Sequence, residues 1–522
     1  VWTIVIVLLT TAPYLINWRA TPAGYQYTWI LPPYPEDSLA YQAWAQQAAQ
    51  GSLLFQDKYT AVPHAPFLFH PFFLIAGWLG AATGIEIGPV FLALKTLGVI
   101  LFFLAFYRYL DWLALDRLSS IAATLLVGIS SGFGGLIMMS GLGPHWPVPV
   151  SDIRLPDLNT FWSLLWNPLF PYSLTLLLLA MFWLDRGTRD GRGRDLLKAG
   201  LANGLLALLH PYSQPLVLAC AAVFLLARWQ RGSSVGLLLR FALATAPFIL
   251  YETLTALLIP IVSLHNLQGH MNSPALSSYL YSYGLPLLLT CLGLVLGRLE
   301  LARRWWPLLM WFTLSLLFAY LPLWFQRKLV FGSHLPLCLL AGICFSTVAN
   351  GLADRAMRAC WLAVGLLVLL PISATTSYYL LVTQYLETRL NADGSSYVPS
   401  DIMAGFKFLK EKSNPSDIVC ASLGTSRLIP AFSGNTALWG HWAMAVDSAE
   451  REKWFEDIFG PDAKGDDPAR AKKFWSAGIR YIFAEGALRR DIEQHPEAWR
   501  LILEQTDQVY TNNLVVIYRR RS

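Results

Sequence analysis

The sequence predicts a polytopic α-helical membrane protein with about 11 transmembrane helices, additional juxtamembrane helices and a C-terminal extracytoplasmic α/β domain. Of its 522 residues, 55% are hydrophobic and only 14% are charged, which is more apolar surface than the interior of a soluble protein of this size absorbs. Apolar runs of about 18–25 residues recur between short Arg-, Asp-, Gly- and Pro-containing stretches, as in membrane-spanning helices. From residue 388 onward, amphipathic helix and short strand patterns replace these runs.

Eleven runs are expected to cross the membrane, and a twelfth, 66–82, is expected to lie at its interface because it is short and has Pro and His near its start. If 66–82 does not cross, fifteen Lys and Arg residues fall in the loops on one side and only five on the other. The positive-inside rule then predicts a cytoplasmic N-terminus, an acidic outer loop over 18–65, and an extracytoplasmic location for everything after residue 378. The predicted spans are 1–17, 89–107, 119–138, 161–184, 196–210, 212–228, 237–262, 284–298, 306–323, 329–350 and 359–378.

The chain is expected to divide into a transmembrane domain, 1–387, and an extracytoplasmic α/β domain, 388–522. Residues 388–401 read as a linker by composition. The remaining segment has a usual size for a single domain, and its alternation of helix and strand patterns favours a partly parallel sheet. Helices are predicted at 405–412, 448–460 and 468–478, and strands at 417–422, 479–485 and 514–520.

Charge and cysteine content exclude some partners. The net charge of +6 comes from basic residues in loops next to the membrane, so no nucleic-acid partner is expected. The six cysteines show no metal-ligand spacing and are interpreted as small buried residues.

An acidic pair, Glu36–Asp37, follows the first predicted span and precedes the polar helix Leu39–Gln50. Carboxylates at a membrane edge are costly unless they face water or a partner, so they are candidates for function. The alternative is that Asp37 and Ser38 only cap the helix. Capping, however, requires neither Glu36 nor the prolines of "PPYP".

A second outer loop, 139–160, carries Asp152 and Asp157 among four prolines that restrict its backbone. Two acidic loops could share one cleft or one divalent cation, such as Mg²⁺ or Mn²⁺, because hard cations take carboxylate oxygens. The alternatives are a solvated loop and, for Asp157, a helix cap.

Three basic residues are candidates for binding an anion at the outer face. Lys95 lies inside the predicted span 89–107 and needs an anionic partner or a route to water. Arg327 and Lys328 stand at the outer end of a helix, where a lipid phosphate would meet them. The alternatives are ordinary phospholipid for Arg327 and Lys328, and an ion pair with Glu86 or a loop carboxylate for Lys95.

Several histidines, including His64, His210 and His334, map to the outer half under this topology. None has a metal-binding spacing such as HExxH. Each is interpreted first as a hydrogen-bonded structural residue, and their shared side favours a polar outward cavity.

These segments together resemble the GT-C superfamily of membrane glycosyltransferases, which includes protein O-mannosyltransferases and the aminoarabinose transferases that modify lipid A. The resemblance is carried by "ED" followed by "SLAYQAWAQQAAQGSLLFQDKYT", by "FHPFFLIAGWLG", by "FQRKLVFGSHLPLCLLAG" and by the block from "DIVCASLGTSR" to "EKWFEDIF". The family's acidic motif is often Asp-Asp or Asp-Glu, so Glu36–Asp37 leaves open which carboxylate acts.

The resemblance implies inverting transfer of a sugar from a polyprenyl-phosphate donor lipid to an acceptor hydroxyl on a glycan, lipid or protein. It places the enzyme in the bacterial inner membrane, with Asp37 as the general base and Glu36 positioning the acceptor or a metal. No organic cofactor is implied. Under this reading Lys95, Arg327 and Lys328 bind the donor phosphate, and the acceptor or metal candidates are Asp152, Asp157, His64, His210 and His334.

Two other functions compete with this one. Transporters and lipid flippases place charges near the bilayer midplane and show repeated halves. Here the charges gather at one face, which favours chemistry on a lipid. A non-catalytic subunit on the same scaffold is the third reading, because intact carboxylates do not prove turnover.

Overall fold

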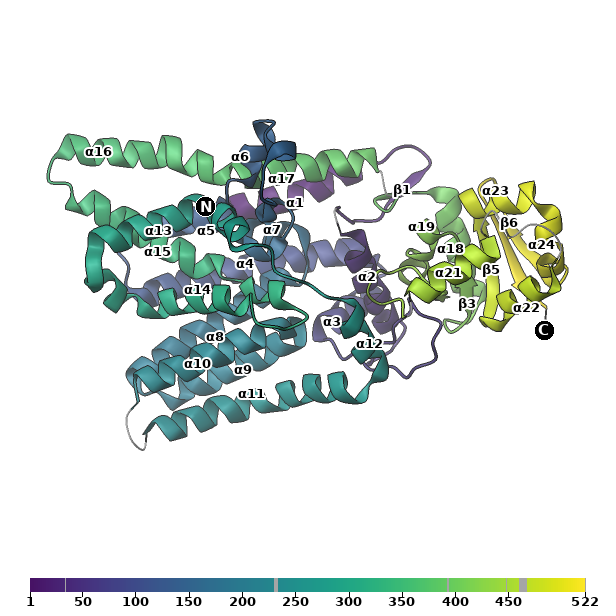
Figure 1. Ribbon diagram of the computed structural model, residues 1–522, viewed down its shortest axis with the longest axis horizontal. Coiled ribbons are helices and arrows are strands. Elements are labelled where there is room, and N and C mark those ends of the chain that lie inside the picture. The colour runs from purple at the N-terminus through teal and green to yellow at the C-terminus, as the bar shows by residue number, and fades with distance from the viewer. Residues whose placement is uncertain (33, 230–232, 392–393, 447, 460–466, 522) are drawn as a thin grey trace. The chain divides into compact units, whose positions relative to one another are not determined.

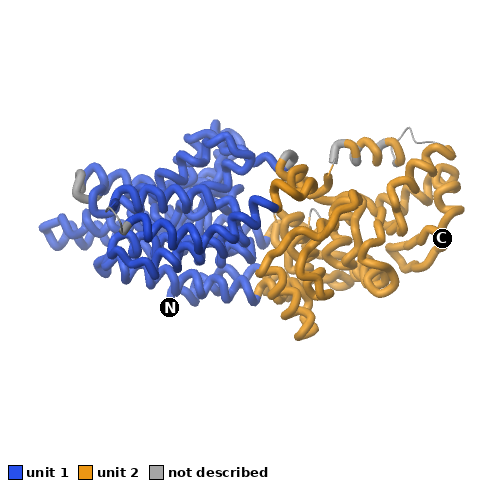
Figure 2. The backbone as a smooth tube through the Cα atoms, turned by 90° about the horizontal axis from the view of Figure 1, so that it is seen from below, with its two compact units in different colours: residues 1–13, 93–254, 269–385 blue, residues 14–92, 255–268, 386–522 orange. Residues whose placement is uncertain are grey.

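A computed structural model describes residues 1–32, 34–229, 233–391, 394–446, 448–459 and 467–521 (Figure 1). They form two compact units (Figure 2). Unit 1 comprises Val1–Pro13, Ala93–Leu254 and Gly269–Tyr385, and unit 2 comprises Tyr14–Leu92, Thr255–Gln268 and Leu386–Ser522.

Unit 1 is helical, and its helices begin and end at residues suited to those positions. Asp116 caps α5 by accepting hydrogen bonds from the backbone N–H groups of Leu118 and Ser119, and Asn159 caps α7 in the same way through Trp162. The helices that contribute to unit 1 are α1 (Trp2–Arg19), α4 (Ile87–Leu113), α5 (Arg117–Ile129), α6 (Gly134–Met139), α7 (Thr160–Trp166), α8 (Phe170–Asp190), α9 (Gly193–Leu209), α10 (Gln214–Ala227), α11 (Ser233–Leu258), α13 (Leu276–Arg304), α14 (Trp306–Phe318), α15 (His334–Gly351), α16 (Arg355–Val364) and α17 (Leu370–Leu390).

Five helical segments among the described residues are long and apolar enough to cross a membrane, as expected for a multi-pass protein. They are 87–113, 234–258, 276–296, 326–351 and 355–390. Four apolar helices are shorter, among them α3 (Pro71–Thr83), which overlaps the predicted interfacial segment 66–82. The mainly helical membrane architecture is therefore confirmed, whereas the count of eleven spans and their orientation stay predictions.

The span containing α15 forms the interior of unit 1. Its apolar window is 94% buried within the protein, whereas the window of 355–390 is only 11% buried. Helices α5, α13 and α14 pack around α15, and α8 lies beside α9 (Figure 1).

Unit 2 contains a short antiparallel pairing between two segments that are far apart in the sequence. Strand β1 (Tyr25–Tyr27) pairs antiparallel with β2 (Tyr397–Pro399), with Gln26 opposite Val398. Helix α2 (Pro35–Ala49) packs on α3, and α12 (Pro260–Gln268) belongs to the same unit. The loop before the first carboxylates is therefore fixed to the segment that follows α17.

The C-terminal part of unit 2 contains a five-stranded mixed sheet in the order β4-β3-β5-β7-β6. Strands β4, β3 and β5 are parallel, and β7 and β6 complete the sheet in antiparallel fashion. The predicted strands within 417–422, 479–485 and 514–520 are all present; β4 and β6 had not been predicted. The elements are α18 (Ser400–Lys412), β3 (Ile418–Cys420), α19 (Leu423–Ser426), α20 (Ile429–Phe432), β4 (Thr436–Ala437), α21 (Ser448–Phe459), α22 (Pro468–Ser476), β5 (Ile479–Glu485), α23 (Gly486–Gln494), α24 (Pro496–Leu503), β6 (Thr506–Thr511) and β7 (Val515–Arg520).

Two apolar clusters hold this sheet. One joins the sheet to α18, α20 and α2 through residues such as Phe406, Phe483 and Leu39. The other packs α22, α23 and α24 on the opposite side around Phe474 and Trp499. The predicted domain boundary at residue 388 stays a prediction; in the structure, Leu386–Ser522 is compact together with Tyr14–Leu92 and Thr255–Gln268.

Candidate functional site

The acidic pair lies in the first turn of α2. Pro35 occupies the first helical position, where its fixed φ and missing N–H suit a helix start. The helix therefore begins before Glu36 and Asp37, four residues earlier than predicted, with Tyr34 at the N-cap and no side chain capping it. The alternative that Asp37 caps the helix is wrong, because Asp37 lies inside the helix.

Glu36 is held by an arginine from the C-terminal part of the same unit. Arg427 Nη1 donates to Glu36 Oε1 at 3.3 Å, and the two side chains are 13% and 30% exposed. The main-chain oxygen of Arg427 in turn accepts a hydrogen bond from the Tyr59 hydroxyl at 3.2 Å. Glu36 is thus neutralised and fixed by a cation that follows it by 391 residues.

Asp37 faces a buried histidine. His441 Nε2 lies 3.8 Å from Asp37 Oδ1; the histidine side chain is 4% exposed and the aspartate side chain 38% exposed. His441 Nδ1 accepts hydrogen bonds from the backbone N–H groups of Ala443 and Met444, each at 3.1 Å. Because Nδ1 is an acceptor, the ring proton lies on Nε2, on the side of Asp37.

His441 is neutral at physiological pH. Burial, followed by the nearby charge of His265, lowers the pKa of His441 to about 3. The ring of Tyr59 packs against the imidazole with centroids 5.4 Å apart. Asp37 is therefore faced by a neutral N–H group and not by an imidazolium cation.

A third carboxylate, Asp57, supports this arrangement. Asp57 Oδ1 accepts the backbone N–H of Tyr59 at 2.7 Å, and Asp57 Oδ2 lies 3.0 Å from His265 Nε2. The same His265 nitrogen is 3.2 Å from the main-chain oxygen of Met444. Asp57 and His265 thus fix the two segments that carry Tyr59 and His441, and we name Glu36, Asp37, Tyr59, Arg427 and His441 the α2 site.

The predicted phosphate-binding cations lie in unit 1. Lys95 is 1% exposed, and its ammonium donates to the main-chain oxygens of Thr10 at 2.6 Å and Leu165 at 2.9 Å. Lys328 Nζ lies 3.3 Å from Asp157 Oδ2, which makes an ion pair of two predicted site residues. Arg327 Nε is buried without a hydrogen-bond partner among the described residues.

The two carboxylates of the second acidic loop, Asp152 and Asp157, form contacts within unit 1. Asp157 pairs with Lys328 and caps no helix; the cap of α7 is Asn159, so the cap alternative for Asp157 is wrong. Asp152 is fully buried, and its Oδ2 accepts from Thr376 Oγ1 at 2.7 Å and from the N–H of Gly134 at 3.1 Å. Among the described residues, no group of three His, Cys, Asp or Glu side chains is placed to hold a metal ion.

The three histidine candidates form hydrogen bonds with other residues of the protein. His64 Nε2 accepts the N–H of Asp57, and His210 Nδ1 lies 2.8 Å from the Ser213 hydroxyl. His334 Nδ1 lies 3.0 Å from the hydroxyl of Thr160. These contacts agree with the structural reading, and their predicted roles toward acceptor or metal stay predictions.

Sequence reasoning missed three of the five residues of the α2 site. It selected Glu36 and Asp37 but neither Arg427 nor His441, although both lie in the C-terminal block whose resemblance was noted. Tyr59 was also missed, although it follows Asp57 in the same outer loop. The joining of Asp37 with Lys95, Arg327 and Lys328 in one site stays a prediction.

Known proteins resemble this chain in structure and not in sequence. No family model matches the chain, and a search of curated proteins finds no match. The apo oligosaccharyltransferase of Archaeoglobus fulgidus is similar at a TM-score of 0.54 and 12% identity, over 100% of this chain and 74% of that one. The arabinofuranosyltransferase AftD from Mycobacteria is similar at 0.53 and 15% identity, over 99% of this chain but only 40% of its own length.

A third structure, ArnT from Cupriavidus metallidurans bound to undecaprenyl phosphate, aligns at a TM-score of 0.48 and 11% identity, over 99% of this chain and 97% of that one. The likeness to the first two establishes the fold, which is that of the GT-C membrane glycosyltransferases. The resemblance predicted from the sequence is confirmed at this level.

Proposed function

We propose that this chain, which has the GT-C fold, is a membrane glycosyltransferase that moves a sugar from a polyprenyl-phosphate donor to an acceptor hydroxyl, with Asp37 as the general base. The observation that carries the proposal is the difference between the two neighbouring carboxylates. The Arg427 guanidinium donates to Glu36, whose side chain is 30% exposed, whereas the Asp37 side chain is 38% exposed and its Oδ1 lies 3.8 Å from His441 Nε2. An accessible carboxylate with a fixed neighbour is suited to taking a proton.

The reaction needs one base and no acid. Asp37 takes the proton of the acceptor hydroxyl as the acceptor oxygen forms its bond to the anomeric carbon of the sugar. The bond between the anomeric carbon and the phosphate oxygen breaks, and its electron pair leaves with the phosphate. A phosphate is a stable anion, so it leaves without protonation, and attack opposite to it inverts the anomeric configuration.

Two features of the α2 site support this role of Asp37. The first turn of a helix stabilises negative charge through the unsatisfied N–H groups and the helix dipole. The Nε2–H of His441 lies on the side of Asp37, with Nε2 3.8 Å from Oδ1, and adds no charge there. Glu36, already bound to Arg427, positions the start of α2.

Arg327 and Lys328 are proposed as the groups that meet the donor phosphate. Arg327 has a buried Nε that lacks a hydrogen-bond partner among the described residues, and Lys328 adds a second positive charge beside Asp157. A guanidinium donates two parallel hydrogen bonds to phosphate oxygens. Lys95 already donates to two main-chain oxygens, which supports a structural role for it.

The test compares Asp37→Asn with Glu36→Gln in the full-length protein. Mass spectrometry of the lipid that purifies with the wild type first identifies the donor. Asp37→Asn is expected to lower transfer by at least about a thousandfold, because an amide takes no proton. Glu36→Gln keeps an acceptor for Arg427 and is expected to lower transfer by about tenfold. Unaltered transfer by Asp37→Asn removes Asp37 from the mechanism.

The proposed location of this chemistry is the outer face of the bacterial inner membrane. With the predicted topology, Ala82 at the end of α3 lies outside. A membrane-impermeant thiol reagent is expected to label Ala82→Cys in intact cells. Labelling that requires permeabilisation reverses the proposed orientation.

A further inference from the structure

Unit 2 contains a large pocket that is separate from the α2 site. Its volume is about 1310 Å³, and it is lined by the end of α1, β1, the polar face of α2, the turn between α3 and α4, and helices α18 and α20. All lining residues belong to unit 2, whereas Glu36, Asp37, Arg427 and His441 do not line it. Pockets that bind small ligands are usually smaller, about 300–1,000 Å³, so this one has room for a chain of several units.

Helix α2 carries the carboxylates in its first turn and also lines the pocket. Gln46 lines the pocket from α2, and Gln50 lines it from the position directly after the helix. Gln46 follows Asp37 by nine residues, which is about two and a half helical turns, so the two side chains leave opposite faces of the helix. A ligand in this pocket therefore contacts a different face of α2 from the one that carries Asp37.

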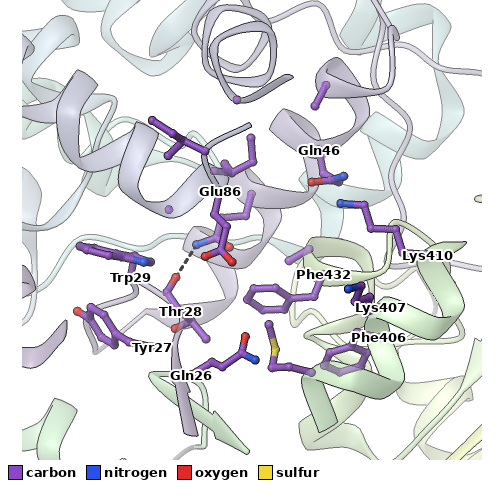
Figure 3. Close-up of a pocket in the computed structure, with 18 of the residues that line it drawn as sticks. Gln26, Tyr27, Thr28, Trp29, Gln46, Glu86, Phe406, Lys407, Lys410 and Phe432 are labelled. Atoms are coloured by element: carbon purple, nitrogen blue, oxygen red, sulfur yellow. Dashed lines mark hydrogen bonds between the residues drawn. The ribbon is translucent and has the colours of Figure 1, made fainter. Parts of the chain in front are cut away.

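The lining combines aromatic faces with neutral hydrogen-bonding groups. Figure 3 shows Gln26 and Glu86 extending toward the middle of the pocket from two sides, with Trp29 on one wall and Phe432 on another. Amide and carboxylate groups donate to and accept from hydroxyls, and aromatic faces pack on apolar ring surfaces. This combination suits a ligand whose rings carry hydroxyl groups on their edges.

The charges in the pocket do not favour a polyanion. Three basic residues line it, Arg19, Lys407 and Lys410, and two acidic residues, Glu86 and Glu411. Lys407 lies 4.0 Å from Glu411, and both side chains are more than half exposed. The pocket thus lacks the cationic surface that nucleic acid or an anionic polymer requires.

The backbone at Trp29 gives an independent indication of a ligand site. Trp29 has φ 64°, a left-handed conformation that is a genuine outlier for a bulky residue. Such conformations persist only where surrounding contacts impose them, and they concentrate at functional sites.

Two neighbours impose this conformation. Trp18 stacks on Trp29 with ring centroids 5.9 Å apart and an interplanar angle of 26°. A Cβ atom at Gly88 would lie 2.7 Å from the Cβ, Cγ and Cδ1 of Trp29, so only glycine permits this packing. The fold thus accepts strain to hold an aromatic ring on the wall of the pocket.

We propose that this pocket is a saccharide-binding subsite that holds a neutral oligosaccharide, with Trp29 as the stacking platform and Gln26, Gln46 and Glu86 binding hydroxyl groups. The binding itself does not depend on sugar transfer at Asp37. If the proposed function holds, the subsite retains a glycan chain at a face of α2 away from the reacting carboxylate.

The test measures binding of defined saccharides to the full-length protein in nanodiscs. Neutral hexasaccharides of glucose, mannose, galactose and arabinofuranose are titrated while tryptophan fluorescence and saturation-transfer NMR are recorded. At least one is expected to bind with a Kd of about 1 mM or lower. Trp29→Ala is expected to weaken binding by about tenfold and Gln46→Ala by about threefold.

The controls separate loss of binding from loss of folding. Trp78→Ala removes another partly exposed tryptophan of unit 2 that does not line the pocket, and it is expected to leave binding unchanged. Gln46→Ala places a good helix former in α2, so it tests the proposal even if Trp29→Ala fails to fold.

Three results would overturn the proposal: no binding by any of the four saccharides, equal binding by wild type and both pocket variants, or occupancy of the pocket only by phosphatidylglycerol from the nanodisc. Loss of transfer in Asp37→Asn together with any of these results rejects the subsite and leaves the proposed function intact. Saccharide binding together with normal transfer by Asp37→Asn rejects the proposed base and leaves the subsite intact.

Discussion

Asp185 of unit 1 and the acidic pair Glu36–Asp37 of unit 2 differ in how far their side chains are exposed. In unit 1, the Asp185 side chain is 1% exposed and is bound by Arg228 at 2.8 Å and by Arg189 at 3.3 Å. In unit 2, the side chains of Glu36 and Asp37 are 30% and 38% exposed. Buried charges must be matched within the protein, whereas a carboxylate at an exposed helix start retains surface for another molecule. The degree of burial therefore separates carboxylates that stabilise the fold from carboxylates that remain accessible to another molecule.

The strongest test of this comparison after Asp37→Asn is Asp185→Asn. It leaves the Arg228 cation without its carboxylate partner in a largely buried place, so we expect a loss of about 3–5 kcal/mol of stability. The midpoint of thermal unfolding measured in detergent reports this loss. Transfer per folded molecule is expected to remain at the wild-type value.

Asp190→Asn is the matched control on the same helix. Asp190 is 26% exposed and pairs with Arg192 at 3.4 Å, so its replacement is expected to change stability by less than about 1 kcal/mol. Equal effects of the two variants would contradict the distinction between buried and exposed charges. A stable Asp185→Asn protein with reduced transfer would instead place Asp185 in the mechanism.

The contact between His441 and Asp37 is tested by two replacements. His441→Asn retains the acceptor role of Nδ1, and His441→Gln retains the donor role of Nε2. Asn at 441 can still accept from the N–H groups of Ala443 and Met444 but presents nothing to Asp37. Gln reaches Asp37 with an amide N–H but loses the local turn. We expect His441→Asn to lower transfer by about tenfold with little change in the unfolding temperature. His441→Gln is expected to be more active than His441→Asn but to unfold at a lower temperature. The reverse order would assign His441 a structural role only.

A smaller effect is expected in the pH dependence of stability. The pKa of His441 falls from 6.5 in the unfolded chain to about 3 in the folded protein, chiefly because of burial. Between these values the unfolded chain binds more protons, so the stability that neutral His441 provides is present above pH 6.5 and is lost as the pH falls toward 3. Unfolding temperatures recorded from pH 7.5 to 4.5 are expected to fall less steeply for His441→Asn than for wild type. Parallel curves would mean that His441 does not stay neutral in the folded protein.

Local patterns in the sequence predicted helices and strands better than they predicted which distant residues contact one another. Apolar runs located long apolar helices, and strand patterns located β3, β5 and β7, because burial constrains the residue type at each position. The start of α2 was predicted too late, because Asp37 and Ser38 look like caps while Pro35 had already begun the helix. The two-residue strand β4 is too short to leave a pattern.

The partners of the α2 site depend on pairings that no local pattern encodes. Arg427 and His441 lie about 400 residues from the carboxylates they contact, and each sits in a segment of ordinary loop composition. Lys95 illustrates the same point: a lone cation in an apolar run predicted an anionic partner or a route to water, and in the structure two main-chain oxygens accept hydrogen bonds from it. Which acceptor a buried cation finds is decided by packing.

The separation of 391 residues between Glu36 and Arg427 also sets the order of events during synthesis. The carboxylates emerge from the ribosome early, but the arginine and histidine that complete their surroundings follow only after the last apolar helix has been made. A chain that stops growing before residue 427 therefore inserts without a finished α2 site. The proposed reactivity toward a lipid-linked sugar is in this way withheld from incomplete chains, without any inhibitor.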